Sequence, residues 1–492
     1  MTIFQRILNI PLSSSIFYRF NSNSTIFALS SGLGKCGVAV VRVSGTNANY
    51  AITQMTNLKN LPEPRKAVLQ NIKHPLTKEI IDKGLVLWFP GPRSFSGEDS
   101  CEFHVHGGIA VVEGILNALN SLPNFKLADP GEFTKRAFLN GKLDLTEVEG
   151  LADLLQAETE AQRKQAFLQS TGSLSKSYKK WKDLLKQSLA NIEADIDFAE
   201  TETLDYGLLE KVEQNIKNLC KELENHLNDG CKGELLRNGV KTVILGEPNA
   251  GKSSLLNLLC HRPASIVTPI SGTTRDVIEV TLNIGGYPLV LADTAGLNIN
   301  SQDVIEIEGM NRARDLYRKA DLIILVVNIQ SYSSVQERYV SFNDYLKNYI
   351  SDLGLSDMNF RKNCIIILNK IDLDTRNLSA NICDKNVVKL SCKSEEGIID
   401  LIDILTKHLK VLCGEPTQEH PSMNQLRHRQ ELEKCYHNLQ RFLKESERKE
   451  SPDTVIMAEY IRKALRNLGK LIGEVTSEEI LDIIFKDFCI GK

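Results

Sequence analysis

The sequence predicts a multidomain α/β protein in which a helical middle domain, formed by two chain segments, is interrupted by an inserted α/β domain. Three observations predict this architecture. The 492 residues amount to about three typical domain lengths. Amphipathic helical periodicity occupies two separate stretches, 144–238 and 414–492. Between them, in 239–413, short β-branched runs alternate with helical stretches, as in a parallel sheet.

The composition excludes several classes of protein. With 42% hydrophobic and 25% charged residues, the chain is typical of a globular protein with sizeable cores. A net charge of -3 provides no whole-chain attraction to nucleic acid, so RNA binding would need local patches. The 11 cysteines form no paired C-x-x-C framework, which favours free thiols in a reducing compartment. No run of 18 apolar residues is present, so we expect no membrane span.

Residues 1–24 have the composition of a mitochondrial transit peptide. The first acidic residue of the chain is Glu63, whereas Arg6 and Arg19 flank apolar and Ser-rich sequence. A secretory signal is the competing interpretation, but Asn9 and Pro11 interrupt the apolar stretch from Leu8 to Leu12. The other alternative is a disordered N-terminus. We predict import into the mitochondrial matrix.

The next segment, 25–143, predicts a mixed α+β domain, because strand-like runs such as 37–43 and 85–89 alternate with loops rich in Gly and Pro. The helical segments that follow carry apolar residues at spacings of three and four. In the first segment these are Trp181, Leu185, Leu189, Ile192 and Ile196, and in the second Leu432, Cys435, Leu439 and Phe442.

A phosphate-binding loop opens the inserted domain. The strand 242–245 leads into Gly246 to Ser253, with the pattern G-x-x-x-x-G-K-S, and a helical stretch follows. The loop's backbone N–H groups and the helix N-terminus would face the phosphates. Lys252 would reach the β- and γ-phosphates, and the Ser253 hydroxyl would bind Mg²⁺. The predicted nucleotide contacts in this loop are Asn249, Ala250, Gly251, Lys252, Ser253 and Ser254.

Companion motifs in order along the chain predict that the nucleotide is GTP. Asp293-Thr294-Ala295-Gly296 follows an apolar strand, where Asp293 can hold Mg²⁺ through water and the Gly296 N–H can sense the γ-phosphate. Asn369-Lys370-Ile371-Asp372 resembles the NKxD motif, whose aspartate accepts both N–H donors of guanine. Ser391-Cys392-Lys393 resembles the SAK loop of GTPases, with Cys392 in place of alanine. We therefore predict an inserted Ras-like P-loop G domain.

A segment between the P-loop and the switch motif completes the predicted magnesium site. Within Gly272 to Asp276, Thr274 can supply the second hydroxyl to Mg²⁺, next to Thr273. Leu297 occupies the place where Ras-like proteins have the glutamine that orients the attacking water. Another group must therefore position the water.

Motifs outside the G domain resemble one family over nearly the whole chain after residue 24, namely the MnmE/TrmE tRNA modification GTPases. The matching segments are 37–45, 88–92, 95–99, 106–108, 130–133, 136–140, 142–145 and the final Cys489-Ile490-Gly491-Lys492, which is similar to the family's C-x-G-K signature. The resemblance is to a mitochondrial member. It implies that 25–143 is a folate-binding domain through which a homodimer forms.

The resemblance also implies roles for individual residues. Arg42, Glu102, Lys142 and Lys492 would contact 5-formyl- or 5,10-methylene-tetrahydrofolate, and the cations suit its anionic tail. Cys489 matches a family cysteine for which a nucleophilic role is conceivable, with packing or folate contact as the alternative. The predicted K⁺ ligands are Asn249, Thr268, Ile270 and Thr273. Glu306 would position the water, with Glu308 as the alternative assignment.

The activity implied by the resemblance is that of a potassium-activated GTPase in tRNA modification. With an FAD-dependent MnmG/GidA-like partner, it would install an aminomethyl-type group, carboxymethylaminomethyl or taurinomethyl, at C5 of the wobble uridine of mitochondrial tRNA. The alternative is a ribosome-assembly or regulatory GTPase of the Era or Der type. Era-like proteins append a KH module with a Gly-x-x-Gly loop and Der-like proteins repeat the G domain, and neither feature is seen in the sequence.

Overall fold

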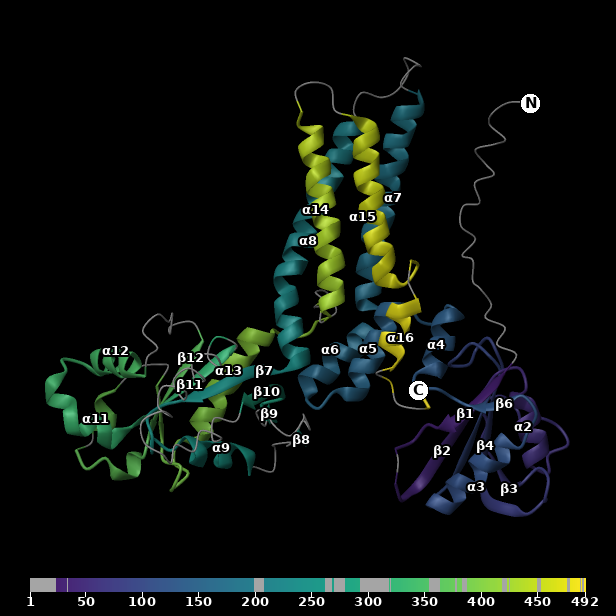
Figure 1. Ribbon diagram of the computed structural model, residues 1–492, viewed down its shortest axis with the longest axis horizontal. Helices are drawn as coiled ribbons and strands as arrows, with labels where there is room; N and C mark the ends of the chain where they lie inside the picture. The colour runs from purple at the N-terminus through teal and green to yellow at the C-terminus, as the bar shows by residue number, and fades with distance from the viewer. Residues whose placement is uncertain are drawn as a thin grey trace. The chain divides into compact units, whose positions relative to one another are not determined.

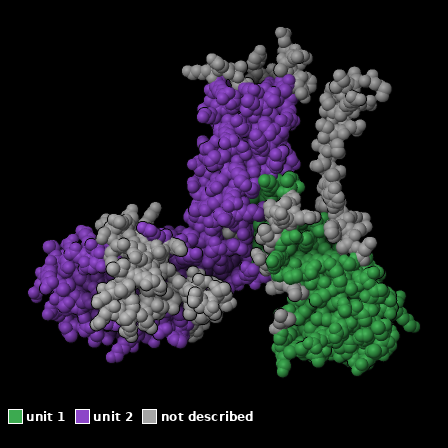
Figure 2. All heavy atoms as spheres, viewed as in Figure 1, with its two compact units in different colours: residues 1–152, 469–492 green, residues 153–468 purple. Residues whose placement is uncertain are grey.

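The computed structural model describes residues 24–32, 34–198, 208–261, 268–269, 279–292, 318, 320–353, 363–376, 378–382, 387–417, 423, 425–448, 453–475, 478–486, 488 and 491–492. The chain forms two compact units (Figure 2), the first made of Met1–Ala152 with Gly469–Lys492 and the second of Asp153–Leu468. The mixed multidomain α/β fold predicted from the sequence is confirmed. Of the predicted transit peptide, 1–23 lie outside the described residues.

The first unit contains a six-stranded sheet with the strand order β3-β4-β5-β2-β1-β6. Its strands are β1 (Thr25–Leu29), β2 (Cys36–Ser44), β3 (Val68–Lys73), β4 (Ile80–Phe89), β5 (Ser100–Gly107) and β6 (Phe125–Leu127). All neighbouring strands are antiparallel except β1 and β6. Alternate residues of β5, among them Phe103 and Val105, are buried in a core shared with helices α2 (Ala48–Met55) and α3 (Ile109–Asn120).

The end of the chain belongs to the same unit as its beginning. Helices α4 (Glu132–Leu139), α5 (Leu145–Gln156) and α16 (Glu478–Lys486) share a small core in which Leu145 packs with Phe485 and Phe488. The approach of the backbones is close: a Cβ on Gly131 would lie 2.4 Å from the Phe485 carbonyl oxygen. The tail, about 340 residues downstream in the chain, thus folds against α4.

Outside the inserted domain, the second unit contains helices from both sides of the insertion (Figure 1). They are α6 (Glu160–Ser170), α7 (Ser173–Phe198), α8 (Leu208–Asn238), α14 (Leu426–Ser446) and α15 (Thr454–Ile472). Helix α14 packs along α8, and its apolar stripe Leu432, Cys435, Leu439 and Phe442 is fully buried. None of the described helices combines the length and apolar character that crossing a membrane requires.

The inserted domain has a seven-stranded sheet with the order β13-β12-β11-β7-β10-β9-β8. Its strands are β7 (Val240–Leu245), β8 (Thr268–Pro269), β9 (Glu279–Ile284), β10 (Tyr287–Ala292), β11 (Leu322–Asn328), β12 (Cys364–Asn369) and β13 (Val387–Leu390). The five strands from β13 to β10 are parallel, and β9 and β8 extend the sheet antiparallel.

Helices cover both faces of this sheet. Helices α9 (Lys252–Cys260) and α13 (Ile398–Cys413) pack on one face, and α11 (Ile329–Val335) and α12 (Phe342–Asp352) on the other. Strand β11 is therefore buried on both of its faces. Ile324 faces one core and Leu325 the other, and both are fully buried. A strand buried on both faces explains why the sequence runs here are apolar without alternation.

Candidate functional site

The P-loop lies at the carboxyl end of β7, a central strand of the parallel sheet, where ligands bind in folds of this type. Three of its residues have positive φ: Gly246 (152°), Asn249 (63°) and Gly251 (102°). A Cβ on Gly246 would lie 2.3 Å from the Val326 carbonyl oxygen, so only glycine fits there. The local backbone therefore requires the glycines of the motif.

Lys252 begins helix α9 and folds back over the loop. Its Nζ donates to the carbonyl oxygens of Gly246 at 2.7 Å and Glu247 at 2.8 Å. Burial lowers the pKa of Lys252, and the nearby Glu247 carboxylate opposes that effect. The next two residues, Ser253 and Ser254, are exposed in the first turn. The N–H groups of a helix's first turn have no intrahelical acceptors, so an anion can bind there.

The predicted guanine-binding motif contacts the P-loop. The Asn369 side chain donates from Nδ2 to the Ala250 carbonyl oxygen at 2.8 Å, and its Oδ1 accepts from the Cys392 N–H at 3.3 Å. The exposed Asp372 accepts a hydrogen bond at Oδ1 from the Ser391 hydroxyl at 2.6 Å. The three predicted motifs therefore meet at one edge of the sheet.

Two more residues of these motifs have defined positions. Lys370 takes a left-handed conformation with φ 65° directly after β12. Lys393 is exposed beside Cys392, and burial raises the pKa of the Cys392 thiol. The contact of Cys392 with Asn369 uses the backbone N–H, which alanine also has, so cysteine in place of alanine leaves this contact intact.

Of the remaining predicted G-domain residues, one lies in a described strand. Thr268 lies in β8, paired with Thr281, and its side chain is not described. The other predicted residues of the magnesium, potassium, switch and water-positioning sets lie outside the described residues: Ile270, Thr273, Thr274, Asp293, Thr294, Ala295, Gly296, Glu306 and Glu308.

A cavity of about 240 Å³ in the first unit contains two of the predicted folate contacts. Arg42 lines it from β2 and Glu102 from β5, where Arg42 Nε lies 3.0 Å from Glu102 Oε1. The Arg42 guanidinium also lies 5.2 Å from the ring centroid of Phe95 and 5.8 Å from that of Phe133. Aromatic rings beside a cation suit a ligand with a flat ring and an anionic tail.

Two further arginines line the same cavity, and sequence reasoning missed them. Arg65 donates from Nη2 to the Arg93 carbonyl oxygen at 2.6 Å, and both residues line the cavity. Arg93 directly follows the segment 88–92 that resembles the family, so extending that motif by one residue would have found it. Arg65 lies in a segment without a recognised motif, so nothing in the sequence marked it as a candidate binding residue.

The other predicted folate residues lie close to this cavity without lining it. Lys142 Nζ donates to the Pro92 carbonyl oxygen at 3.1 Å. The main-chain oxygen of Lys492 accepts from the N–H groups of Phe133 at 3.0 Å and Thr134 at 3.2 Å, in the first turn of α4. Since Phe133 lines the cavity, the tail is anchored beside it. Cys489 lies outside the described residues.

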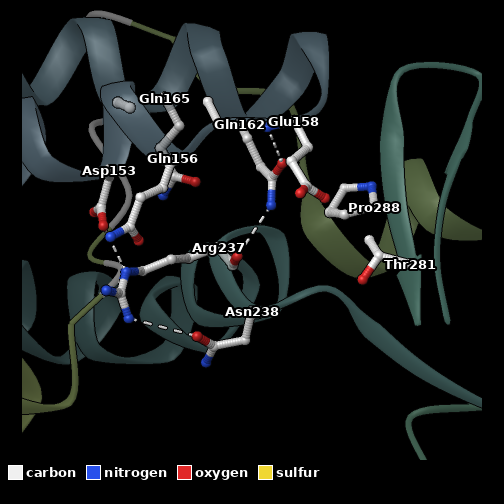
Figure 3. A pocket seen from close by; sticks show the side chains of 11 residues that line it. Asp153, Gln156, Glu158, Gln162, Gln165, Arg237, Asn238, Thr281 and Pro288 are labelled. Atoms are coloured by element: carbon white, nitrogen blue, oxygen red, sulfur yellow. Dashed lines mark hydrogen bonds and ion pairs between the residues drawn. The ribbon is translucent and has the colours of Figure 1, made fainter. Parts of the chain in front are cut away.

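A second cavity, of about 380 Å³, lies where α8 passes into β7 (Figure 3). The buried Asp153 accepts from Arg237 Nε at 2.7 Å, and Gln162 Nε2 donates to the Arg237 carbonyl oxygen at 3.0 Å. None of the predicted site residues lines this cavity. Its polar groups hold the last turn of α8 at the entry to the inserted domain.

Comparison with known proteins agrees with these features. The family model described as the MnmE helical domain matches residues 145–489, and that described as the GTP-binding protein TrmE N-terminus matches 25–142. The chain is 48% identical to the mitochondrial 5-taurinomethyluridine-tRNA synthase subunit GTPB3 of Danio rerio, over 96% of this chain and 93% of that protein. It is 44% identical to the Homo sapiens protein of the same name, over 96% and 94%. It is also 44% identical to the tRNA modification GTPase MnmE of Parvibaculum lavamentivorans, over 95% and 100%.

Proposed function

The chain belongs to the MnmE/TrmE family of tRNA modification GTPases, and on that premise we propose that it is the GTP-hydrolysing subunit of a mitochondrial enzyme that modifies wobble uridine. The relatives at 48% and 44% identity are named as mitochondrial taurinomethyluridine synthase subunits. A taurinomethyl group at C5 is therefore favoured over a carboxymethylaminomethyl group. The site of action is the mitochondrial matrix, and the substrate is mitochondrial tRNA.

The observation that carries the GTPase assignment is the meeting of the P-loop, Asn369 and Asp372 at one edge of the sheet. Asp372 has its second carboxylate oxygen available for guanine, and Lys252 is held beside the phosphate position. A bound Mg²⁺ would be held by the hydroxyls of Ser253 and Thr274 and would neutralise phosphate charge. The contacts to base and phosphate together select GTP.

Potassium would support hydrolysis in place of an arginine finger, by neutralising charge on the transferring phosphoryl group. Its ligands would be Asn249, Thr268, Ile270 and Thr273. Glu306 would position the attacking water, with Glu308 as the alternative. Support for the potassium site comes from Asn249, which is exposed within the P-loop and has a left-handed backbone.

The one-carbon part of the reaction would use the cavity at Arg42. A bound 5-formyl- or 5,10-methylene-tetrahydrofolate would supply one carbon, while Arg42, Glu102, Lys142 and Lys492 bind and orient it. The arginines that line the cavity support an anionic ligand. Cys489 would act as a nucleophile near this site. An FAD-dependent MnmG/GidA-like protein is the proposed partner, and the protein would form a homodimer through its N-domain.

Mass spectrometry of wobble nucleosides in mitochondrial tRNA tests this proposal. Cells that lack the protein should lose the taurinomethyl group, the wild type should restore it, and Lys252→Ala should not. Detection of carboxymethylaminomethyluridine would show that a different group is attached at C5, but the protein would still be assigned to the modification of wobble uridine. Unchanged nucleosides in the deficient cells would favour the Era-type or Der-type alternative.

A further inference from the structure

We propose that Tyr349, on helix α12, is a positioning residue for the phosphate-binding Lys252. Its side chain is 2% exposed, and its hydroxyl makes two hydrogen bonds inside the G domain. It donates to the Val326 carbonyl oxygen near the end of β11 at 2.9 Å, and it accepts from the Glu247 N–H of the P-loop at 2.8 Å. Tyr349 thus joins a helix, a strand and the P-loop through one oxygen atom.

The contact with Glu247 leads directly to Lys252. The N–H of Glu247 and the carbonyl of Gly246 belong to the same peptide group, and that carbonyl accepts from Lys252 Nζ at 2.7 Å. Hydrogen bonds on both sides of one peptide group polarise it and strengthen each other. The Tyr349 hydroxyl therefore orients the peptide to which the lysine ammonium is bound.

The atoms around this peptide are packed so closely that a side chain at Gly246 would not fit. A Cβ on Gly246 would lie 2.3 Å from the Val326 oxygen and 3.3 Å from the Tyr349 hydroxyl. Loss of the hydroxyl would leave the Glu247 N–H without this acceptor and the Val326 oxygen without this donor. The first peptide of the P-loop could then rotate, and Lys252 would lose its defined position at the phosphates.

Tyr345 supplies a matched control, because it lies one turn earlier on the same helix. Its ring centroid is 5.7 Å from that of Tyr349, and its side chain is 5% exposed. Among the residues that the structure describes, the Tyr345 hydroxyl has no hydrogen-bond partner. Tyr345→Phe therefore removes the same atom from the same core without breaking a described hydrogen bond.

The experiment compares the wild type, Tyr349→Phe and Tyr345→Phe in the full chain. We expect Tyr349→Phe to weaken the binding of GTP and GDP about tenfold, because both hydrogen bonds of the hydroxyl are lost and the peptide that holds Lys252 is no longer fixed. Binding of guanosine should stay unchanged, because it has no phosphate for Lys252 to contact. Tyr345→Phe should match the wild type in all three measurements.

A double-mutant cycle then tests whether Tyr349 acts through Lys252. In a Lys252→Ala background, Tyr349→Phe should cause little further loss of GDP binding. The inference is overturned if Tyr349→Phe binds GDP like the wild type, if guanosine binding falls equally, or if the two losses add. It rests on the proposed GTPase function, and a wild type that fails to bind GTP would instead contradict that function.

Discussion

Asn369 and Ala250 lie 119 residues apart in the chain and are joined by a hydrogen bond of 2.8 Å from the amide Nδ2 to the carbonyl oxygen. The contact is tight, because a Cβ on the neighbouring Gly251 would lie 2.1 Å from the same Nδ2. Asn369 also accepts from the Cys392 N–H. One side chain thus ties the phosphate loop to both loops that would read the base.

Asp372→Asn should change the nucleotide preference from guanine to xanthine. The Asp372 carboxylate would accept both N–H donors of guanine. The amide of asparagine offers one acceptor and one N–H donor, which match the ring N–H and the carbonyl oxygen on the corresponding edge of xanthine. We expect GTP binding to weaken at least tenfold and xanthosine triphosphate binding to improve, by competition with a fluorescent nucleotide. Equal affinity of the wild type for ATP and GTP would contradict the assigned role of Asp372.

Replacement of KCl by NaCl at constant ionic strength should lower GTP turnover, because the proposed cation loop is matched to K⁺. Asn249→Ala should abolish the difference between the two salts. Since Asn249 has φ 63°, alanine also adds backbone strain. Asn249→Gly removes the amide without that strain and should give the same result. Equal wild-type rates in both salts would argue against the potassium site.

Deletion of Cys489 to Lys492 should separate the two proposed activities. The deletion removes the acceptor of the Phe133 and Thr134 N–H groups beside the Arg42 cavity. GTP turnover should stay within a few fold of wild type. Binding of 5-formyltetrahydrofolate, measured by calorimetry, should weaken by roughly 1.5–3 kcal/mol. Wobble modification should fail in complemented cells.

Two outcomes would count against this separation of activities. Normal folate affinity together with normal modification would show that the tail has no role at the cavity. A parallel collapse of GTP turnover would point to loss of the fold, which circular dichroism can detect.

Acidification should destabilise the helical bundle through His226. Burial, and then the nearby His428, lowers the pKa of His226 to about 4. The unfolded chain, with a histidine pKa of about 6.5, takes up the proton first, so stability is full above that pH and falls toward pH 4. Between pH 7 and 5 the free energy of unfolding should drop by about 1–2 kcal/mol from this residue.

Urea unfolding at both pH values, followed by circular dichroism, measures this dependence. His226→Gln should flatten it, because glutamine does not titrate. His437→Gln, which alters an exposed histidine on α14, serves as the control and should retain the wild-type profile. A wild-type profile for His226→Gln would refute the assignment.

Features that depend on local backbone and spacing could be predicted from the sequence. Gly246, Gly251 and Lys252 occupy fixed places in a strand-loop-helix unit, so their pattern alone predicts the loop that the structure contains. The same holds for the stripe on α14, where apolar residues every three or four positions become one buried face.

Contacts between distant elements were decided by tertiary structure alone. Sequence spacing relates neither Tyr349 to Glu247 nor Arg65 to Arg42. The packing of α12 on β11 brings the first pair together. The path of the loop before β3 brings the second pair to one cavity. An isolated tyrosine on an amphipathic helix is indistinguishable from any other core residue. Which of two neighbouring tyrosines finds a partner for its hydroxyl depends on the backbone that the rest of the chain places opposite it.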